Sequence, residues 1–199
     1  MSKDWTGNGN SVFKTLGASN HSAGERAELD YYATDPAAVV ALLEREEFDG
    51  PIWEPACGGG HISEQLINCG FRVRSTDIVN RGYFRQNETF DFLEEDRVFY
   101  GDIITNPPYK YAAEFVEHAL ELTTAGSKVA MFLKLTFLEG AKRKTLFDKY
   151  PPKTVYVFRN RIDCWKNGIE PVKPSKAVCY AWFVWEYGYT GETVIKWIN

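Results

Sequence analysis

The sequence contains no apolar run that approaches the length of a membrane span, and its first residues lack the apolar stretch of a signal peptide. Only four of its 199 residues are cysteines, and their spacing matches no metal-binding pattern. A chain of this length forms a sizeable core without disulfide bridges. These absences predict a cytoplasmic protein with reduced thiols, without a metal site and without a membrane partner.

Positive charge is not in excess either, since the net charge is −4 and the isoelectric point is about 5.5. This balance argues against a protein that binds nucleic acid over its whole surface. The charge is unevenly distributed, however. Residues 1–133 contain 11 basic and 21 acidic residues, whereas residues 134–176 contain 11 basic and 4 acidic ones. The basic segment is either a solvated face or a surface that contacts phosphate, and charge alone favours the first.

Residues 1–30 are rich in glycine, asparagine, serine and alanine and show no helical or strand period, which predicts an arm or long loop. The rest of the chain has no internal repeat and no sign of a second domain. Asp35 followed by Pro36 is typical of a helix start, and the apolar pattern after it predicts a helix that ends before Asp49.

From residue 51 onward, strand and helix patterns alternate. Strand patterns occur at residues 51–54, 71–76, 101–105 and 128–133, helical patterns at 61–68 and 111–124, and a weaker unit near 89–93. Such alternation predicts an α/β fold whose mostly parallel sheet carries helices on both faces. Two strand-like runs, at 154–158 and 177–185, follow without a helix between them. They predict an antiparallel C-terminal hairpin that closes one edge of the sheet.

The first segment with chemical content is residues 54–61 (EPACGGGH), at the end of a predicted strand. Glycines there let the backbone turn tightly and approach a ligand closely. The segment lacks the ending of a phosphate-binding P-loop, and Glu54 would repel phosphate but attract an ammonium group. Asp77 ends the next strand, where it suits either the two hydroxyls of a ribose or a simple turn. Together the two acids bracket a ligand that carries an ammonium group and an adenosine.

The second segment is residues 106–109 (NPPY), directly after an apolar strand. Its prolines remove two backbone donors and leave carbonyl groups free to accept hydrogen bonds. The Asn106 oxygen and a neighbouring carbonyl can therefore receive both hydrogens of an exocyclic amino group. Tyr109 offers a flat face for a planar group. A proline turn without chemistry is the alternative, which we disfavour because α/β sheets bind ligands at such strand ends.

With these two motifs the chain resembles the class I S-adenosylmethionine-dependent amino-methyltransferases, and its motif order is that of the gamma type of adenine-N6 DNA methyltransferase. Residues 31–36 (YYATDP) and 91–93 (DFL) match further family motifs, and nearly the whole chain resembles small phage and prophage DNA methyltransferases. The resemblance implies a Rossmann-like class I methyltransferase fold with a seven-stranded sheet. It implies one catalytic domain over residues 31–199 and no separate target-recognition domain.

The resemblance also assigns roles to residues. The cofactor would be bound by Tyr32, Thr34, Glu54, Ala56, Gly58, Gly60, Asp77, Ile78, Asp91 and Phe92. Within this set, the methionine ammonium would meet Glu54, its carboxylate Tyr32 and Thr34, the ribose Asp77, and the adenine Asp91 and Phe92. The catalytic residues would be Asn106, Pro107, Pro108 and Tyr109. Substrate would contact Lys134, Phe158, Arg159, Arg161 and Trp165, although the two aromatic residues also fit core or hairpin packing.

The resemblance therefore implies direct methyl transfer from S-adenosylmethionine to an exocyclic amine, with adenine N6 in DNA as the favoured target. The product of the cofactor would be S-adenosylhomocysteine, and no metal would take part. The same chemistry could act on cytosine N4, on RNA or on protein glutamine. A phage module that binds cofactor or nucleic acid without catalysis is a third interpretation, which the intact NPPY segment disfavours.

Overall fold

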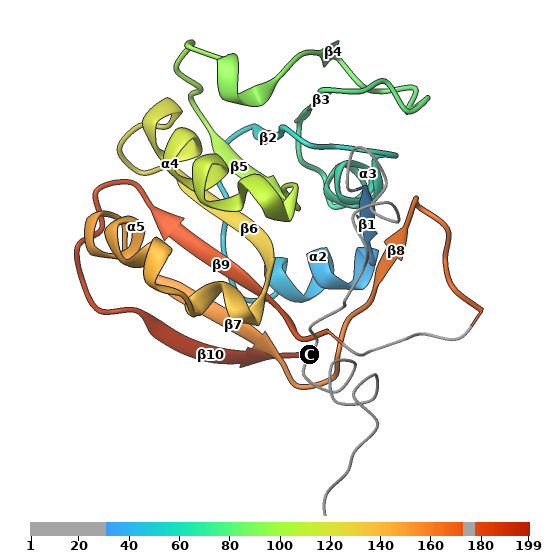
Figure 1. Cartoon of the computed structure of the whole chain (residues 1–199). Coiled ribbons are helices and arrows are strands. Elements are labelled where there is room, and N and C mark those ends of the chain that lie inside the picture. The colour runs from blue at the N-terminus through green and yellow to red at the C-terminus, as the bar shows by residue number, and fades with distance from the viewer. Residues whose placement is uncertain (1–30, 173–177) are drawn as a thin grey trace, which may run out of the picture.

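The computed structural model describes residues 31–172 and 178–199. The predicted arm at residues 1–30, together with Lys173 and Lys176 of the basic segment, lies outside the described residues. The central strands are β2 (Ile52–Glu54), β3 (Val73–Asp77), β4 (Glu88–Thr89), β5 (Asp102–Thr105), β6 (Lys128–Lys134), β7 (Thr154–Phe158), β9 (Tyr180–Glu186) and β10 (Val194–Ile198). They form one eight-stranded sheet in the order β10-β7-β9-β6-β5-β2-β3-β4 (Figure 1).

The strands that carry the two motifs are parallel neighbours. β2 pairs in parallel with both β3 and β5, and β5 pairs in parallel with β6. The carboxyl ends of these strands therefore meet at one edge of the sheet. Because Glu54, Asp77 and Asn106 lie at or just after the ends of β2, β3 and β5, this topology brings the two motifs together.

The predicted C-terminal antiparallel pair is confirmed as β7 and β9. β9 lies between β6 and β7, however, and β10 adds an eighth strand that runs parallel to β7. The sequence pattern did not predict this edge strand because four of its five residues are exposed, so no alternation of apolar and polar residues marks it.

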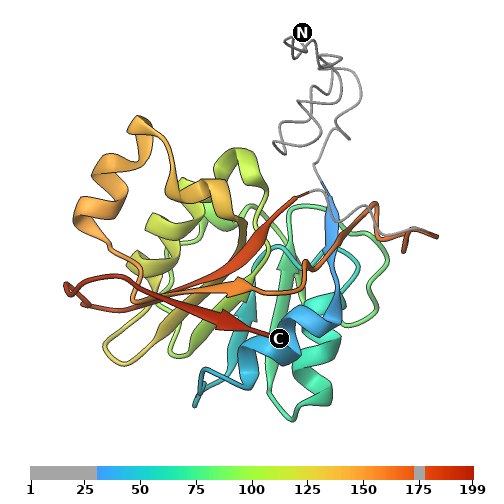
Figure 2. The same ribbon diagram turned by 90° about the horizontal axis from the view of Figure 1, so that it is seen from below.

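Helices cover both faces of the sheet, as predicted. They are α2 (Pro36–Leu43), α3 (His61–Asn68), α4 (Ala112–Leu122) and α5 (Lys144–Lys149). Successive residues of a strand point to opposite faces. In β6, Val129 and Met131 pack with the side chains of α4 and α5, whereas Ala130 and Phe132 pack with those of α2 and α3. Figure 2 shows these two pairs of helices on opposite sides of the sheet.

Shorter elements complete the fold. Among the described residues, the short 3-10 helices are η1 (Phe92–Glu94), η2 (Tyr109–Tyr111), η3 (Leu135–Leu138) and η4 (Ala141–Arg143). Asp35 caps α2 as predicted, since its Oδ1 accepts a hydrogen bond of 2.9 Å from the Ala37 backbone N–H. In the described part of the chain, no helix combines the length and the apolar character that a membrane crossing needs.

A separate two-stranded ribbon lies beside the sheet. It pairs β1 (Tyr32–Thr34) antiparallel with β8 (Cys164–Lys166), and Thr34 stands opposite Cys164 (Figure 1). The ribbon joins the start of the described chain to the segment between β7 and β9. Sequence patterns did not predict it, because three residues are too few to show a strand period and the partners are far apart in the chain.

Candidate active site

A cavity of about 880 Å³ opens at the carboxyl edge of the parallel strands. This volume is in the range of pockets that bind cofactors and drug-sized ligands. Its walls come from β1, from η1 and from the segments that follow β2, β3 and β5. Of the predicted cofactor-binding and catalytic residues, the lining contains Tyr32, Thr34, Glu54, Ala56, Asp77, Ile78, Asp91, Phe92, Asn106, Pro107, Pro108 and Tyr109.

Two tyrosine rings pack against the glycine turn, and the contact of Gly58 and Gly60 with a cofactor stays a prediction. Gly58 and Gly60 have φ values of 54° and 84°, in the left-handed region that favours glycine. A Cβ at Gly58 would lie 2.2 Å from the Tyr31 ring, and one at Gly60 would lie 2.3 Å from the Tyr83 ring. The two glycines therefore admit tyrosine rings, and residues on either side of the turn line the cavity instead. A local motif cannot reveal rings that come from other segments.

Glu54 is a buried acid at the end of β2, with 2% of its surface exposed. The Ser63 hydroxyl donates a hydrogen bond to Oε2 of Glu54, and Ser75 Oγ lies 2.6 Å from Ser63 Oγ. Burial raises the pKa of Glu54 well above its usual range, and the Ser63 hydrogen bonds oppose that shift. A buried carboxylate needs a partner of opposite charge, and an ammonium group beside Glu54 would supply it.

Asp77 is held in its turn by two backbone donors. Its Oδ2 accepts a hydrogen bond of 2.8 Å from the Gly58 N–H, and its Oδ1 accepts one of 2.9 Å from the Val79 N–H. Asp77 therefore has the hydrogen bonds of a turn residue, as the alternative interpretation predicted. Each carboxylate oxygen accepts more than one hydrogen bond, so both can still receive ligand hydroxyls in the cavity that Asp77 lines.

Asp91 and Phe92 lie at the start of η1. Asp91 Oδ1 accepts a hydrogen bond of 3.0 Å from the Leu93 N–H and so caps this turn. The Phe92 side chain is 2% exposed and packs edge-on against Trp53, with ring centroids 5.1 Å apart. Both residues line the cavity, but Phe92 has little exposed surface and serves mainly to anchor the wall.

Asn106 has a fixed amide orientation. Its Nδ2 donates hydrogen bonds of 2.9 Å to the Tyr32 carbonyl and 3.0 Å to Thr34 Oγ1. An amide nitrogen carries only two hydrogens, so both are used to hold the side chain to β1. Oδ1 therefore remains as an acceptor, next to the Pro107 carbonyl in the chain.

Tyr109 is half-buried and contacts several side chains. The Tyr32 ring is stacked on it with centroids 6.4 Å apart, and Lys134 Nζ lies 4.9 Å from its ring centre. Its hydroxyl lies 3.8 Å from Cys164 Sγ. Burial raises the pKa of Tyr109 well above its usual range, so the phenol is neutral at physiological pH. Stacking of a substrate on this ring stays a prediction.

Comparison with known proteins bears on the fold. No family model matches the chain, and no curated protein matches it. Solved structures do. A Listeria monocytogenes protein assigned to the class I S-adenosylmethionine-dependent methyltransferases matches with a TM-score of 0.58 and 14% identity, over 92% of this chain and 69% of that one.

Two further structures match. The M protein of the type I restriction enzyme EcoKI has a TM-score of 0.53 and 15% identity, over 80% of this chain and 44% of its own length. An Agrobacterium tumefaciens protein assigned as an O-methyltransferase has a TM-score of 0.55 and 10% identity, over 82% of this chain and 85% of its own. The chain has the class I methyltransferase fold. At these identities the likeness extends to the fold alone.

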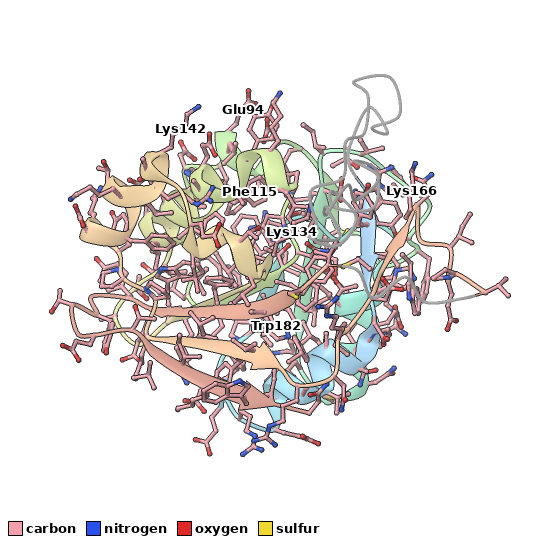
Figure 3. The ribbon with its side chains drawn as sticks, turned by 60° about the horizontal axis from the view of Figure 1, so that its bottom comes forward. Glu94, Phe115, Lys134, Lys142, Lys166 and Trp182 are labelled. Atoms are coloured by element: carbon pink, nitrogen blue, oxygen red, sulfur yellow. The ribbon has the colours of Figure 1, made fainter. Side chains whose placement is uncertain are left out.

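Within this methyltransferase fold, the predicted substrate residues lie outside the cavity lining. Arg159 and Arg161 are exposed, and Trp165 is half-buried with its ring edge-on to His61 at 5.6 Å. Phe158 is 7% exposed and packs in the core, which matches the packing role that the sequence left open. Lys134 is near the site because it contacts the Tyr109 ring. Figure 3 shows Lys142 and Lys166 on opposite sides of the molecule with Lys134 between them, so these three lysines do not form one cluster.

Sequence reasoning missed several cavity residues. Tyr31 and Arg81 both line the cavity, and the Arg81 guanidinium lies 4.6 Å from the centre of the Tyr31 ring. His61 also lines it, and burial lowers the pKa of His61. Tyr31 and His61 lie within the motif segments 31–36 and 54–61, which was a usable signal, whereas nothing in the local sequence singles out Arg81. Over the described residues, no group of His, Cys, Asp or Glu side chains could hold a metal ion.

Proposed function

We propose that the protein is an S-adenosylmethionine-dependent methyltransferase that acts on an exocyclic amino group, with adenine N6 in DNA as the target. One observation carries this proposal. Two motifs about fifty residues apart, the acid that ends β2 and the NPPY segment after β5, line the same cavity at the carboxyl edge of a class I methyltransferase sheet.

The acids of the cavity fit this cofactor. Glu54 is buried and would hold the methionine ammonium, Asp77 would receive the ribose hydroxyls, and Asp91 would border the adenine. Arg81 is a cation in the same lining and would complement the methionine carboxylate. When bound, the cofactor supplies a methyl group on a sulfonium, which is an electrophile that needs no metal. Its product is S-adenosylhomocysteine.

The NPPY segment would prepare the amine. Asn106 Oδ1 and the Pro107 carbonyl would each accept one hydrogen of the target amino group. These two bonds draw the nitrogen away from the plane of its ring, which weakens its conjugation and frees its lone pair for attack. Holding the amine in line with the methyl group is the other contribution of the site, because orientation alone can supply a large part of a rate enhancement.

Three observations support DNA as the substrate. The stretch from residue 134 to 172 contains exposed cations, among them Arg159 and Arg161, that can contact phosphate. Tyr109 lies in the cavity lining, where an extrahelical base would have to enter. One of the structural matches is part of a restriction enzyme. Taking a base out of a duplex costs a few kcal/mol, which phosphate contacts can offset.

The test is nucleoside mass spectrometry after incubation of the purified protein with S-adenosylmethionine that carries a deuterated methyl group. Parallel reactions contain duplex DNA, single-stranded DNA, RNA and a protein mixture. Labelled N6-methyl-2′-deoxyadenosine from the DNA reactions supports the proposal. Label only in N4-methylcytosine, in RNA or in protein overturns the choice of substrate. The absence of label from every reaction, with cofactor binding intact, overturns the enzymatic proposal itself.

A further inference from the structure

Thr34 makes a contact that differs from its expected role. As a cofactor-binding residue it would contact the methionine carboxylate. In the structure its Oγ1 instead accepts a hydrogen bond of 3.0 Å from Asn106 Nδ2. Thr34 is 2% exposed and also lines the cavity, so its hydroxyl meets the Asn106 amide at the wall of the site.

The Asn106 amide depends on this contact for its orientation. Its two N–H groups have two acceptors, the Tyr32 carbonyl and the Thr34 hydroxyl, and both acceptors belong to β1. The oxygen and the NH2 group of an amide are similar in size, so packing alone does not determine which of the two faces the substrate. If the amide turned over, Oδ1 would face the Tyr32 carbonyl oxygen, and the NH2 group would face the hydrogens of the substrate amine. Both contacts are electrostatically unfavourable. The Thr34 hydroxyl accepts the second N–H and so holds the amide in the observed orientation.

β1 is itself held in place by a second strand. It pairs with β8, and Thr34 stands opposite Cys164 in that ribbon. The acceptors of the Asn106 amide are therefore on a strand with a defined register, at a site where fixed orientation contributes directly to rate.

We propose that Thr34 is a positioning residue that fixes the Asn106 amide with its oxygen toward the substrate amine, and that it does not bind the cofactor carboxylate. This proposal rests on the proposed methyltransferase function. In metal sites, loss of the hydrogen-bond partner that orients a functional side chain lowers activity by roughly 10- to 100-fold, and we expect an effect of the same order on kcat here.

Three variants test it. Thr34→Val keeps the shape of the side chain and removes the acceptor. Thr34→Ser keeps the hydroxyl. Thr154→Val is the matched control, because Thr154 is also a buried threonine, 3% exposed, at the start of β7 and hence at the opposite edge of the sheet. The measurements are kcat, the Kd of S-adenosylmethionine, and the side-chain amide signal of Asn106 in 15N NMR spectra.

The expected result is a kcat that falls 10- to 100-fold in Thr34→Val and stays near wild type in Thr34→Ser and Thr154→Val. The cofactor Kd should stay within about twofold, and the Asn106 amide protons should exchange faster in Thr34→Val. A Kd that rises tenfold with an unchanged amide signal would show that Thr34 binds the carboxylate. Wild-type kcat in Thr34→Val would also overturn the proposal. A wild-type protein without any turnover instead counts against the proposed function, while the amide signal still tests the contact.

Discussion

Replacement of Glu54 by glutamine should change stability and cofactor affinity in opposite directions. Burial raises the pKa of Glu54 in the folded protein, so its ionised form is less stable there than in the unfolded chain. The sign follows from this direction. The folded wild-type chain loses stability as the pH rises through the raised pKa of Glu54, and a glutamine at this position does not ionise. We therefore expect Glu54→Gln to be the more stable chain at pH 7 to 8.

The expected loss of affinity for S-adenosylmethionine in Glu54→Gln follows from the burial of the carboxylate. Glu54 is 2% exposed and lines the cavity, so its contact with an ammonium group would be a desolvated, charge-assisted hydrogen bond. Such bonds contribute about 1.5–3 kcal/mol. Their loss should raise the Kd of S-adenosylmethionine roughly 10- to 150-fold. Isothermal titration calorimetry measures this affinity, and urea denaturation without cofactor at several pH values measures the stability.

A matched variant separates burial from net charge. Glu121→Gln removes the same charge from an exposed position of α4 and should change neither quantity appreciably. The stability advantage of Glu54→Gln over wild type should shrink as the pH falls below the raised pKa. A Glu54→Gln protein that is less stable at pH 8, or that binds the cofactor as tightly as wild type, would refute the reasoning about this site.

Three further predictions concern other parts of the chain. Asn106→Ala should abolish methyl transfer but leave the cofactor Kd within about threefold, which calorimetry and a labelled-methyl assay can show together. Glu95→Gln should lower the free energy of unfolding at pH 7, because hydrogen bonds with Arg97 lower the pKa of Glu95 from 4.5 to about 2. The difference in stability from wild type should disappear as the pH falls from 4.5 toward 2. Gly60→Ala should cost more stability than Gly70→Ala, since both positions have positive φ but only at Gly60 would a Cβ meet a neighbouring ring. Overpacking of this kind costs about 1–3 kcal/mol, and equal losses would contradict the assigned role of that ring.

The sequence predicted those parts of the fold that local patterns determine. Strands β2, β3, β5 and β6 and helices α3 and α4 lie where apolar periodicity predicted them, within one or two residues at each end. The convergence of Glu54, Asp77 and Asn106 was also predictable, because the ends of parallel strands meet at one edge. These inferences need only the order of elements along the chain.

What the sequence could not show depends on contacts between distant segments. The Tyr31 ring on Gly58, the Asn106 amide on β1, and the pairing of β1 with β8 each join residues that no local period relates. A glycine motif has the same appearance whether a ligand or a tyrosine ring approaches it. In the structure a tyrosine ring lies against Gly58, and the residues that flank the turn line the cavity.

The two halves of the candidate site therefore differ in how they are built. Glu54 and Asp77 are placed by strands of the central sheet. Glu54 accepts a hydrogen bond from Ser63 of α3 and Asp77 one from the glycine turn, so their positions follow from the core of the fold. Asn106 follows a central strand too, but its amide nitrogen donates both of its hydrogens to β1, and β1 pairs with β8. The segment that contains β8 also carries the exposed cations Arg161 and Lys166. The strand that orients the amine acceptor is thus paired directly with a strand from the basic segment.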